Sequence, residues 1–376
     1  MSSSQILRPR MLEYLSQCQD PRKHRIRHSL TDIIVIVILG TLCGEEGWEE
    51  LFEWAVDKQE YLETFLSLKH GIPCPDTLRR VMERLDPDSF FCAFSAWAKE
   101  LQARTAGQIC IDGKVLKRAE DENGYPLQLV SAWSQTNRVV LGVEIAGPKK
   151  RGEIPAIEEL LDTLVFLPGD IVTTDAIGCQ KTIMQKIESA GAGYVIALKK
   201  NQPTLYAETD NFFIQAMEAP EYAPCKVHSY ESQCHGRTEK HEVWVSTELD
   251  WLEFKEEWAG LRCLVMINRQ WVSEGKEHSE RRYYVSNLSS DPKDLGTLIR
   301  NHWSIENEYH WHLDVTLGED ESRISGKANR NLRIARDISL KLLKSEPTSK
   351  KGLRSKRGRC HRSDKYLTQV LMSGKF

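Results

Sequence analysis

The sequence predicts an α/β fold, in which a mixed five-stranded sheet of order 3-2-1-4-5 follows a helical N-terminal region and is interrupted by a β-rich insertion. Two observations predict this fold. Residues 1–103 carry apolar side chains at helical spacing, and from residue 108 the segments follow the order β-β-β-α-β-α-β. Because crossovers between parallel strands are right-handed, the first strand is expected beside the fourth.

The composition is that of a globular chain. Its 376 residues are 40% hydrophobic and 28% charged, enough for two or three domains. The ten cysteines form no CxxC pair, which favours reduced thiols over a disulfide framework. The apolar run "IIVIVILGTLC" is well short of the roughly 20 residues that a membrane span needs. We therefore expect a cytoplasmic protein with no membrane partner.

The N-terminal helices are expected in four segments. "SLTDIIVIVILGTLCG" begins with a capping residue, Ser29 or Thr31, and ends near Gly44. "GWEELFEWAVDKQEYLETFL" has apolar residues three and four apart, which is typical of an amphipathic helix. "PCPDTLRRVMERL" and "DPDSFFCAFSAWAKELQ" complete the region. We assign residues 1–103 to an N-terminal helical domain.

A second domain is expected over residues 104–345. "QICIDGK" is a strand that should stop at the Asp112-Gly113 turn, and "LQLVSAWS" and "RVVLGVEIA" continue it as a meander. The helix "EIPAIEELLDTL", the strand "DIVTTDA", the helix "CQKTIMQKIESAG" and the strand "GYVIALKKNQ" follow. Residues 223–286 read as a β-rich insertion. After it, "SDPKDLGTLIRNHWSIENEYHWHLDV" returns to helix.

Charge is distributed unevenly along the chain. Although the formal net charge is -3, residues 344–376 carry ten Lys or Arg against Glu346 and Asp364. A polyanionic partner and a solvated tail both explain this pattern. We treat residues 346–376 as a basic C-terminal tail.

Two carboxylates are expected at one edge of the sheet. Asp112 and Asp175 each end a strand, and the two strands should be parallel neighbours. Like charges this close are unfavourable unless a cation lies between them. Taken singly, each residue has a structural explanation, because Asp-Gly turns are common and a strand-end Asp often caps a helix.

The stretch "IRNHWSIENEYHWHLDV" allows two interpretations. On an α-helix His302, Glu306 and His310 share one face. The two histidines stand about 12 Å apart at roughly 1.5 Å per residue, too far to grip one zinc ion easily. Alternatively, Glu306 joins Asp112 and Asp175 in an oxygen-ligand site for Mg²⁺ or Mn²⁺. Two such ions about 4 Å apart suit phosphodiester chemistry.

The chain resembles the H-repeat-associated proteins and their insertion-sequence relatives, which are DDE transposases with an RNase H-like catalytic core. The resemblance runs almost end to end, through "GWEELFEWA", "GIPCPDTLRRV", "IDGKVLKRA", "EIPAIEELLDTL", "IVTTDAIGCQK", "ALKKNQP", "HGRTEKHEVWV" and "RNHWSIENEYHWHLDV". It implies that Asp112, Asp175 and Glu306 are the metal-binding and catalytic triad. Asp112 would serve both ions, and Asp175 and Glu306 one each.

The implied function is a DNA transposase that uses divalent metal ions to cleave DNA strands at the ends of its element and to transfer them to target DNA. The implied partners are double-stranded element ends and target DNA, and a homodimer in the DNA complex is compatible with this. The alternative is a remnant that no longer transposes and at most binds DNA.

The resemblance is incomplete around Glu306. The wider transposase group often has Tyr, Arg and Lys near this position, and here the corresponding residues are Ile299, His302 and Leu313, with Arg300 as a substitute for the Arg. In that group, the Tyr, Arg and Lys residues contact DNA phosphates near the cleavage site. The residues that we expect to contact DNA are His235, Arg237, Arg300, His302, Lys199 and Asn201. For His235 and Arg237, a hairpin turn that merely faces water is the simpler alternative.

Overall fold

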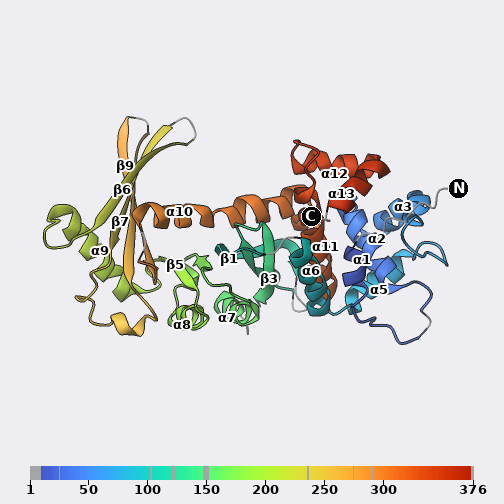
Figure 1. Cartoon of the computed structure of the whole chain (residues 1–376), viewed down its shortest axis with the longest axis horizontal. Helices are drawn as coiled ribbons and strands as arrows, with labels where there is room; N and C mark the ends of the chain where they lie inside the picture. Colours follow the sequence, from blue (N-terminus) through green and yellow to red (C-terminus); the bar gives the residue numbers. More distant parts are fainter. Residues whose placement is uncertain are drawn as a thin grey trace. The chain divides into compact units, whose positions relative to one another are not determined.

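The computed structural model describes residues 10–24, 26–101, 104–120, 124–146, 152–234, 237–273, 275–289 and 291–373. The chain divides into two units (Figure 1). The first contains Met1–Arg104, Val115–Leu127 and Glu308–Phe376, and the second contains Thr105–Lys114 and Gln128–Asn307. No helix in these described ranges is long and apolar enough to cross a membrane.

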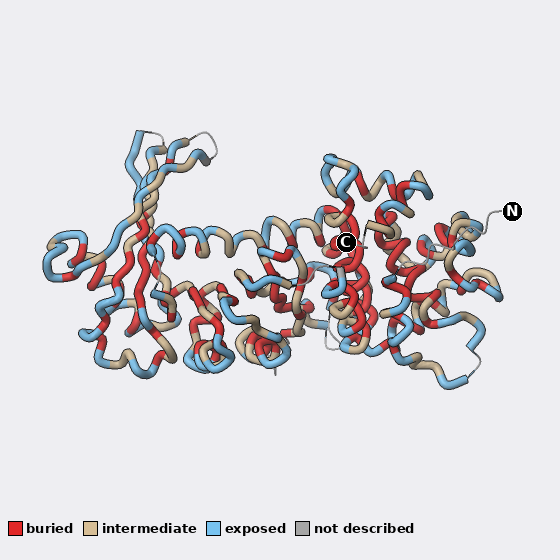
Figure 2. The backbone as a smooth tube through the Cα atoms, viewed as in Figure 1, coloured by how far each residue is buried: buried red, intermediate tan, exposed pale blue. Residues whose placement is uncertain are grey.

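The first unit is mainly helical. Its helices are α1 (Met11–Leu15), α2 (Leu30–Cys43), α3 (Trp48–Asp57), α4 (Gln59–Leu62), α5 (Pro75–Arg84), α6 (Pro87–Leu101), α11 (Gly326–Ser345), α12 (Leu353–Arg362) and α13 (Asp364–Ser373), with the short turns η4 (His312–Thr316) and η5 (Glu319–Glu321). Figure 2 shows α2 and α11 buried along most of their length. The apolar run from Ile33 is therefore a buried helix, capped by Ser29 as the sequence predicts, because the Ser29 side chain accepts from the Asp32 N–H.

The segment from residue 346, expected to be a basic tail, is instead folded. α12 and α13 pack in the first unit, and some of their basic side chains form hydrogen bonds within it. The buried Lys356 ammonium donates to the carbonyls of Leu343 (3.1 Å) and Glu346 (2.5 Å). Apolar residues interleaved with the charges, such as Tyr366 and Leu367, give these helices a buried face. The count of basic residues concealed this pattern.

One sheet of nine strands runs through the chain. Its order is β3-β2-β1-β4-β5-β9-β8-β7-β6. The strands are β1 (Gln108–Glu120), β2 (Pro126–Ser134), β3 (Val139–Ala146), β4 (Ile171–Thr174), β5 (Gly193–Leu198), β6 (Lys226–Cys234), β7 (Arg237–Ser246), β8 (Cys263–Ser273) and β9 (Lys276–Ser286). The predicted order 3-2-1-4-5 is confirmed for the first five. The predicted total of five is too small, because β9 pairs antiparallel with β5 and the insertion extends the same sheet.

Strand β1 does not end at Asp112-Gly113, as the sequence analysis expects. It continues to Glu120, and Gly113 is not among the glycines with positive φ. Within the first unit, the later part of β1 is tied to η5 by an ion pair between Lys117 and Asp320 (2.7 Å) and by one between Arg118 and Glu321 (2.7 Å). An Asp-Gly pair permits a turn, but here pairing and these ion pairs keep the backbone extended.

Helices cover both faces of the sheet in the second unit (Figure 1). They are α7 (Glu153–Thr163), α8 (Lys181–Ser189), α9 (Pro203–Glu218) and α10 (Pro292–His302), with the short turns η1 (Ala176–Gly178) and η2 (Lys255–Glu257). α7, α8 and α9 contribute Leu160, Ile183 and Phe213 to the larger core. α10 lies on the opposite face, where Leu295 and Ile299 pack against Val195 and Val243.

The helix predicted from residue 290 to 315 changes its winding near the middle. Asp291 caps α10 by accepting from the Lys293 N–H (2.9 Å), and Ser290 lies outside the described residues. After His302 the chain continues as a π-helical segment, η3 (Ile305–His310), and then as η4, which is also π-helical. In a π-helix each N–H bonds to the carbonyl five residues earlier, so the regular α-helix expected through His302, Glu306 and His310 is not kept in this segment.

Candidate active site

The two predicted aspartates lie side by side at the junction of β1 and β4. These strands are parallel, with Cys110 paired to Thr173 and Ile111 to Thr174. Asp112 and Asp175 are the next residues in this register. Because neighbouring strands are about 4.8 Å apart, the two residues are direct neighbours.

The loop after β4 holds Asp175 in place. Its carboxylate accepts from the Ile177 N–H (3.0 Å) and caps η1, which is the structural role that the sequence offered as an alternative for this residue. Asn201, which follows β5, donates from Nδ2 to the Ala176 carbonyl (2.7 Å). Asn201 therefore supports the loop that carries Asp175.

Helix α10 brings Glu306 to the same region. Gln108 of β1 donates from Nε2 to Thr173 Oγ1 of β4 (3.0 Å) and to the Leu298 carbonyl of α10 (2.7 Å). Further along β1, Cys110 Sγ lies 3.7 Å from the Asn301 carbonyl. Side chains two apart on a strand share a face, so Gln108, Cys110 and Asp112 all face α10. The segment after α10 begins there and carries Glu306.

Electrostatics connect the three carboxylates. The pKa of Asp112 is raised to about 7, first by burial and then by the negative charge of Asp175, with Glu153 and Glu306 adding to the effect. A hydrogen bond from the Gly113 N–H opposes this rise. Asp112 is thus a half-buried carboxyl group whose pKa responds to the charges of three others.

The donor set suits a hard cation. Carboxylate oxygens are the ligands that Mg²⁺ and Mn²⁺ prefer. A cation would also relieve the repulsion that raises the pKa of Asp112. In the described ranges, no three His, Cys, Asp or Glu side chains already form an arrangement that could hold a metal ion.

Glu153 was missed by the sequence analysis. It is the first residue of α7, and its Oε2 accepts from Gln128 Nε2 of β2 (2.9 Å). Burial, followed by the charge of Asp175, raises its pKa. An acidic residue at the start of a helix fits an ordinary preference of the helix N-terminus, and this hid it in the sequence.

His302 has a partner within the fold. His302 is the last residue of α10, and its Nδ1 lies 3.0 Å from Thr173 Oγ1 of β4. Burial lowers its pKa to about 4, and the charge of Asp175 only partly offsets this. The imidazole is therefore neutral at pH 7.

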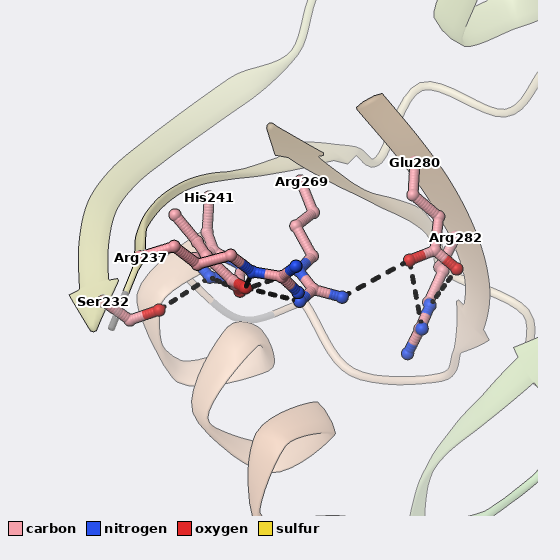
Figure 3. A network of polar contacts seen from close by, with 7 residues as sticks. Ser232, Arg237, His241, Arg269, Glu280 and Arg282 are labelled. Atoms are coloured by element: carbon pink, nitrogen blue, oxygen red, sulfur yellow. Dashed lines mark hydrogen bonds and ion pairs between the residues drawn. The ribbon is translucent and has the colours of Figure 1, made fainter. Parts of the chain in front are cut away.

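The insertion carries a group of arginines around one buried carboxylate (Figure 3). Glu239 of β7 accepts from Arg237 Nε (2.8 Å) and from Arg269 Nη2 of β8 (2.6 Å). Both guanidinium groups lie over the Trp271 ring, at 5.3 and 4.8 Å from its centroid. The predicted hairpin turn with His235 lies outside the described residues.

The remaining predicted DNA contacts lie nearer to α10 and β5. Arg300 is exposed on α10, with its guanidinium 5.9 Å from the centroid of Tyr230 on β6. His241 stacks on Tyr230. Burial lowers the pKa of His241, the charge of Glu239 opposes this, and the charges of Arg269 and Arg300 lower the pKa further. Arg300 thus lies next to the arginine group. Lys199 is exposed just after β5.

Known families and proteins match nearly the whole chain. Residues 12–98 match the family described as DDE_Tnp_1-associated, and residues 104–336 match the Transposase DDE domain. The chain is 32% identical to the "H repeat-associated putative transposase YhhI" of Escherichia coli (strain K12), over 96% of this chain and 97% of that protein. It is 33% identical to the "Putative transposase YncI" of Escherichia coli O157:H7, over 96% of this chain and 94% of that protein.

Proposed function

The chain belongs to the DDE transposase family, and from this premise we propose that it cleaves DNA with divalent metal ions held by Asp112, Asp175 and Glu306. We assign β1–β5 with their helices to an RNase H-like core within residues 104–345. The reaction is strand cleavage at the ends of an insertion-sequence-like element, followed by strand transfer into target DNA. It takes place in the cytoplasm, where a homodimer would hold two ends.

One observation carries the proposal. The pKa of the half-buried Asp112 is raised to about 7, first by burial and then by the negative charges of Asp175, Glu153 and Glu306. Keeping such a group crowded costs stability unless a ligand offsets the repulsion. A bound Mg²⁺ or Mn²⁺ ion would offset this repulsion. Two bound ions would activate the attacking oxygen and stabilise the leaving oxygen of a phosphodiester.

The chain's own residues position this site. β1 and β4 fix Asp112 beside Asp175, and Asn201 restrains the loop after Asp175. Gln108 ties α10 to both strands. Glu306 therefore approaches from the face of the sheet that α10 covers, opposite to α7, α8 and α9. We assign His302 a positioning role, because its neutral ring lies against Thr173 rather than offering a charge to phosphate.

DNA is proposed to run from Glu306 along α10 to the insertion. Arg237, Arg269 and Arg282 on the insertion share the two carboxylates Glu239 and Glu280, and Arg300 on α10 adds an exposed cation beside them. This leaves net positive charge for phosphates, and Trp271 and Tyr230 add ring faces beside it. Lys199 and His235 complete the proposed phosphate contacts.

A nicking assay tests the proposal. DNA carrying the flanks of the gene, where the element ends would lie, is incubated with protein and Mg²⁺ or Mn²⁺. Wild-type protein should nick it, and Asp112→Asn, Asp175→Asn and Glu306→Gln should not. Glu158→Gln is the control, because the Glu158 carboxylate accepts from Thr182 on α8, away from the triad. Cleavage that survives in the triad variants would refute the assignment.

The alternative, a DNA-binding remnant, is favoured by one observation. Where the wider transposase group often has Tyr, Arg and Lys, this chain has the buried Ile299, the neutral His302 and the buried Leu313. If wild-type protein binds the flanking DNA but never nicks it with either metal, this alternative holds.

A further inference from the structure

We propose that Glu239 is a positioning residue for DNA binding: its buried carboxylate holds Arg237 and Arg269 side by side, so that the two guanidinium groups together bind one phosphate of the DNA backbone. The inference rests on the proposed function, in which DNA runs along this part of the insertion, and it adds the group that gives the arginines their geometry. Three features of the second unit support it: the hydrogen bonds of Glu239, the position of both arginines over Trp271, and the face of the sheet on which they lie.

Glu239 joins the two arginines through a carboxylate that is almost completely enclosed. Its Oε1 accepts from Arg237 Nε (2.8 Å) and from Arg269 Nη2 (2.6 Å), and its Oε2 accepts from Arg269 Nε (2.8 Å). The Glu239 side chain is only 3% exposed. Hydrogen bonds from Arg269, and then from Arg237, lower the pKa of Glu239 to about 2 against the opposing effect of burial. The carboxylate is therefore ionised at neutral pH, and its two bonds fix the plane of the Arg269 guanidinium.

The arginines keep donors for a second anion. Arg237 uses only Nε on Glu239, and across the residues that the structure describes its Nη1 and Nη2 make no hydrogen bond. The Arg237 side chain is 35% exposed, so this end of the fork is open to solvent. Trp271 supports both guanidinium groups by its ring. Because one carboxylate balances only one of two cations held this close, a phosphate at the outer side would offset the remaining charge.

The arginine pair faces the same side of the sheet as α10. On β7, Glu239 lies four residues before Val243, so the two side chains share a face of the strand. Val243 packs against Leu295 of α10. Since Glu306 also approaches from the face that α10 covers, DNA held by the arginine pair would lie on the side of the sheet from which Glu306 approaches.

Stability alone is a poor reason for this arrangement. Taking a carboxylate and its cations out of water costs about as much as their attraction returns, and apolar side chains of similar volume often serve a fold equally well. The ion pairs instead set the direction in which each guanidinium points, which matters when a planar fork has to meet a phosphate.

DNA binding by Glu239→Gln tests the proposal, because charge and geometry predict opposite results. If only charge matters, removing a carboxylate from a DNA-binding surface should strengthen binding. If Glu239 positions the arginines, the variant should bind roughly 10-fold more weakly at low salt, the order expected for one charge-assisted hydrogen bond. Affinity is measured by fluorescence anisotropy with a labelled duplex that carries a flank of the gene, in EDTA so that no strand is cut.

The salt dependence of binding separates positioning from folding. The slope of log affinity against log salt, measured from about 50 to 200 mM, should fall in magnitude by about 1 in Glu239→Gln, because one phosphate contact is lost. A partly unfolded variant would have a smaller binding-competent fraction and an unchanged slope.

Glu242→Gln is the matched control. It removes the same charge from the same strand, but Glu242 is three residues from Glu239 and therefore lies on the opposite face. There it pairs with Lys240 (2.8 Å) and accepts from Asn268 Nδ2 (3.2 Å). This variant should bind the duplex as tightly as wild type or more tightly, with an unchanged slope.

Arg237→Lys is a second test variant, and it keeps every charge. Lysine has a single ammonium group in place of a planar fork, so it cannot hold Glu239 and a phosphate in this geometry. It should reproduce the weaker binding and the smaller slope. Because Arg237 is partly exposed, Arg237→Lys should fold even if Glu239→Gln does not, and its result then decides.

The outcomes separate this inference from the proposed function. If Arg237→Ala weakens DNA binding while Glu239→Gln and Arg237→Lys bind at least as tightly as wild type, this face binds DNA by charge alone and the positioning role is overturned. Equal changes in Glu239→Gln and Glu242→Gln would overturn it as well, because loss of charge would then account for both. If wild-type protein does not bind the duplex, or if Arg237→Ala binds it like wild type, the proposed DNA contacts of the insertion and this inference both fail.

Discussion

Replacing Asp112 with asparagine should stabilise the metal-free protein at pH 8. The pKa of Asp112 is raised from 3.8 to about 7, chiefly by burial and by Asp175. Between these two values the folded protein retains a proton that the unfolded chain releases, so stability falls as pH rises through this window. A shift of about 3 units at roughly 1.4 kcal/mol each sets an upper limit of about 4 kcal/mol for the gain.

Urea unfolding of wild type and Asp112→Asn, followed by tryptophan fluorescence in EDTA at pH 5 and pH 8, measures this gain. The variant should be more stable at pH 8 by up to that limit, and the advantage should shrink at pH 5, where wild-type Asp112 is largely protonated. A variant that is less stable at pH 8, or equally favoured at both pH values, would refute the account of a crowded, buried carboxylate.

The remaining predictions concern the surroundings of the site and the C-terminal helices. Arg237→Ala should weaken DNA binding and reduce its salt dependence, yet cost less than about 1 kcal/mol of stability, because Arg269 still neutralises Glu239. Arg269→Ala should lower the free energy of unfolding by about 3 kcal/mol or more. Equal urea midpoints for Arg237→Ala and Arg269→Ala would contradict this. Asn201→Ala should lose about 1 kcal/mol and weaken Mn²⁺ binding by loosening the Asp175 loop, which calorimetry can measure; unchanged affinity would remove the positioning role. Truncation after residue 345 should disrupt the helical unit, visible as lost helical circular dichroism, because buried Lys356 holds α11 to α12. The exposed charges are better tested by neutralising Arg354, Arg362 and Lys365 together, which should lower the salt slope of DNA binding if the segment contacts phosphate.

The strand order was predictable because its determinants are local. Alternating apolar residues mark each strand, and right-handed crossovers leave few ways to connect them. The attachment of the insertion was not predictable in the same way. Val195 of β5 pairs with Ser286 of β9, about ninety positions later. Neither segment has a sequence pattern that identifies the other as its pairing partner. The residues expected to form the insertion carry β6 to β9, but their place in the same sheet was not foreseen.

The site shows the same limit on a smaller scale. That Asp112 and Asp175 are neighbours was predictable because each follows an apolar run and the two runs form parallel neighbouring strands. Glu153 gave no such signal, since its proximity depends on a missing Cβ at Gly113 and on a bond from Gln128. The π-helical winding that carries Glu306 was also hidden, because the sequence between residues 299 and 315 suits an α-helix equally well.

Anomalous diffraction from crystals grown with Mn²⁺ tests the central claim most directly. If Asp112, Asp175 and Glu306 form one divalent-metal centre, manganese peaks should appear in contact with Asp112 and Asp175, with Glu306 drawn toward them. Peaks that lie elsewhere, or crystals that bind manganese without any peak at Asp112, would contradict the account.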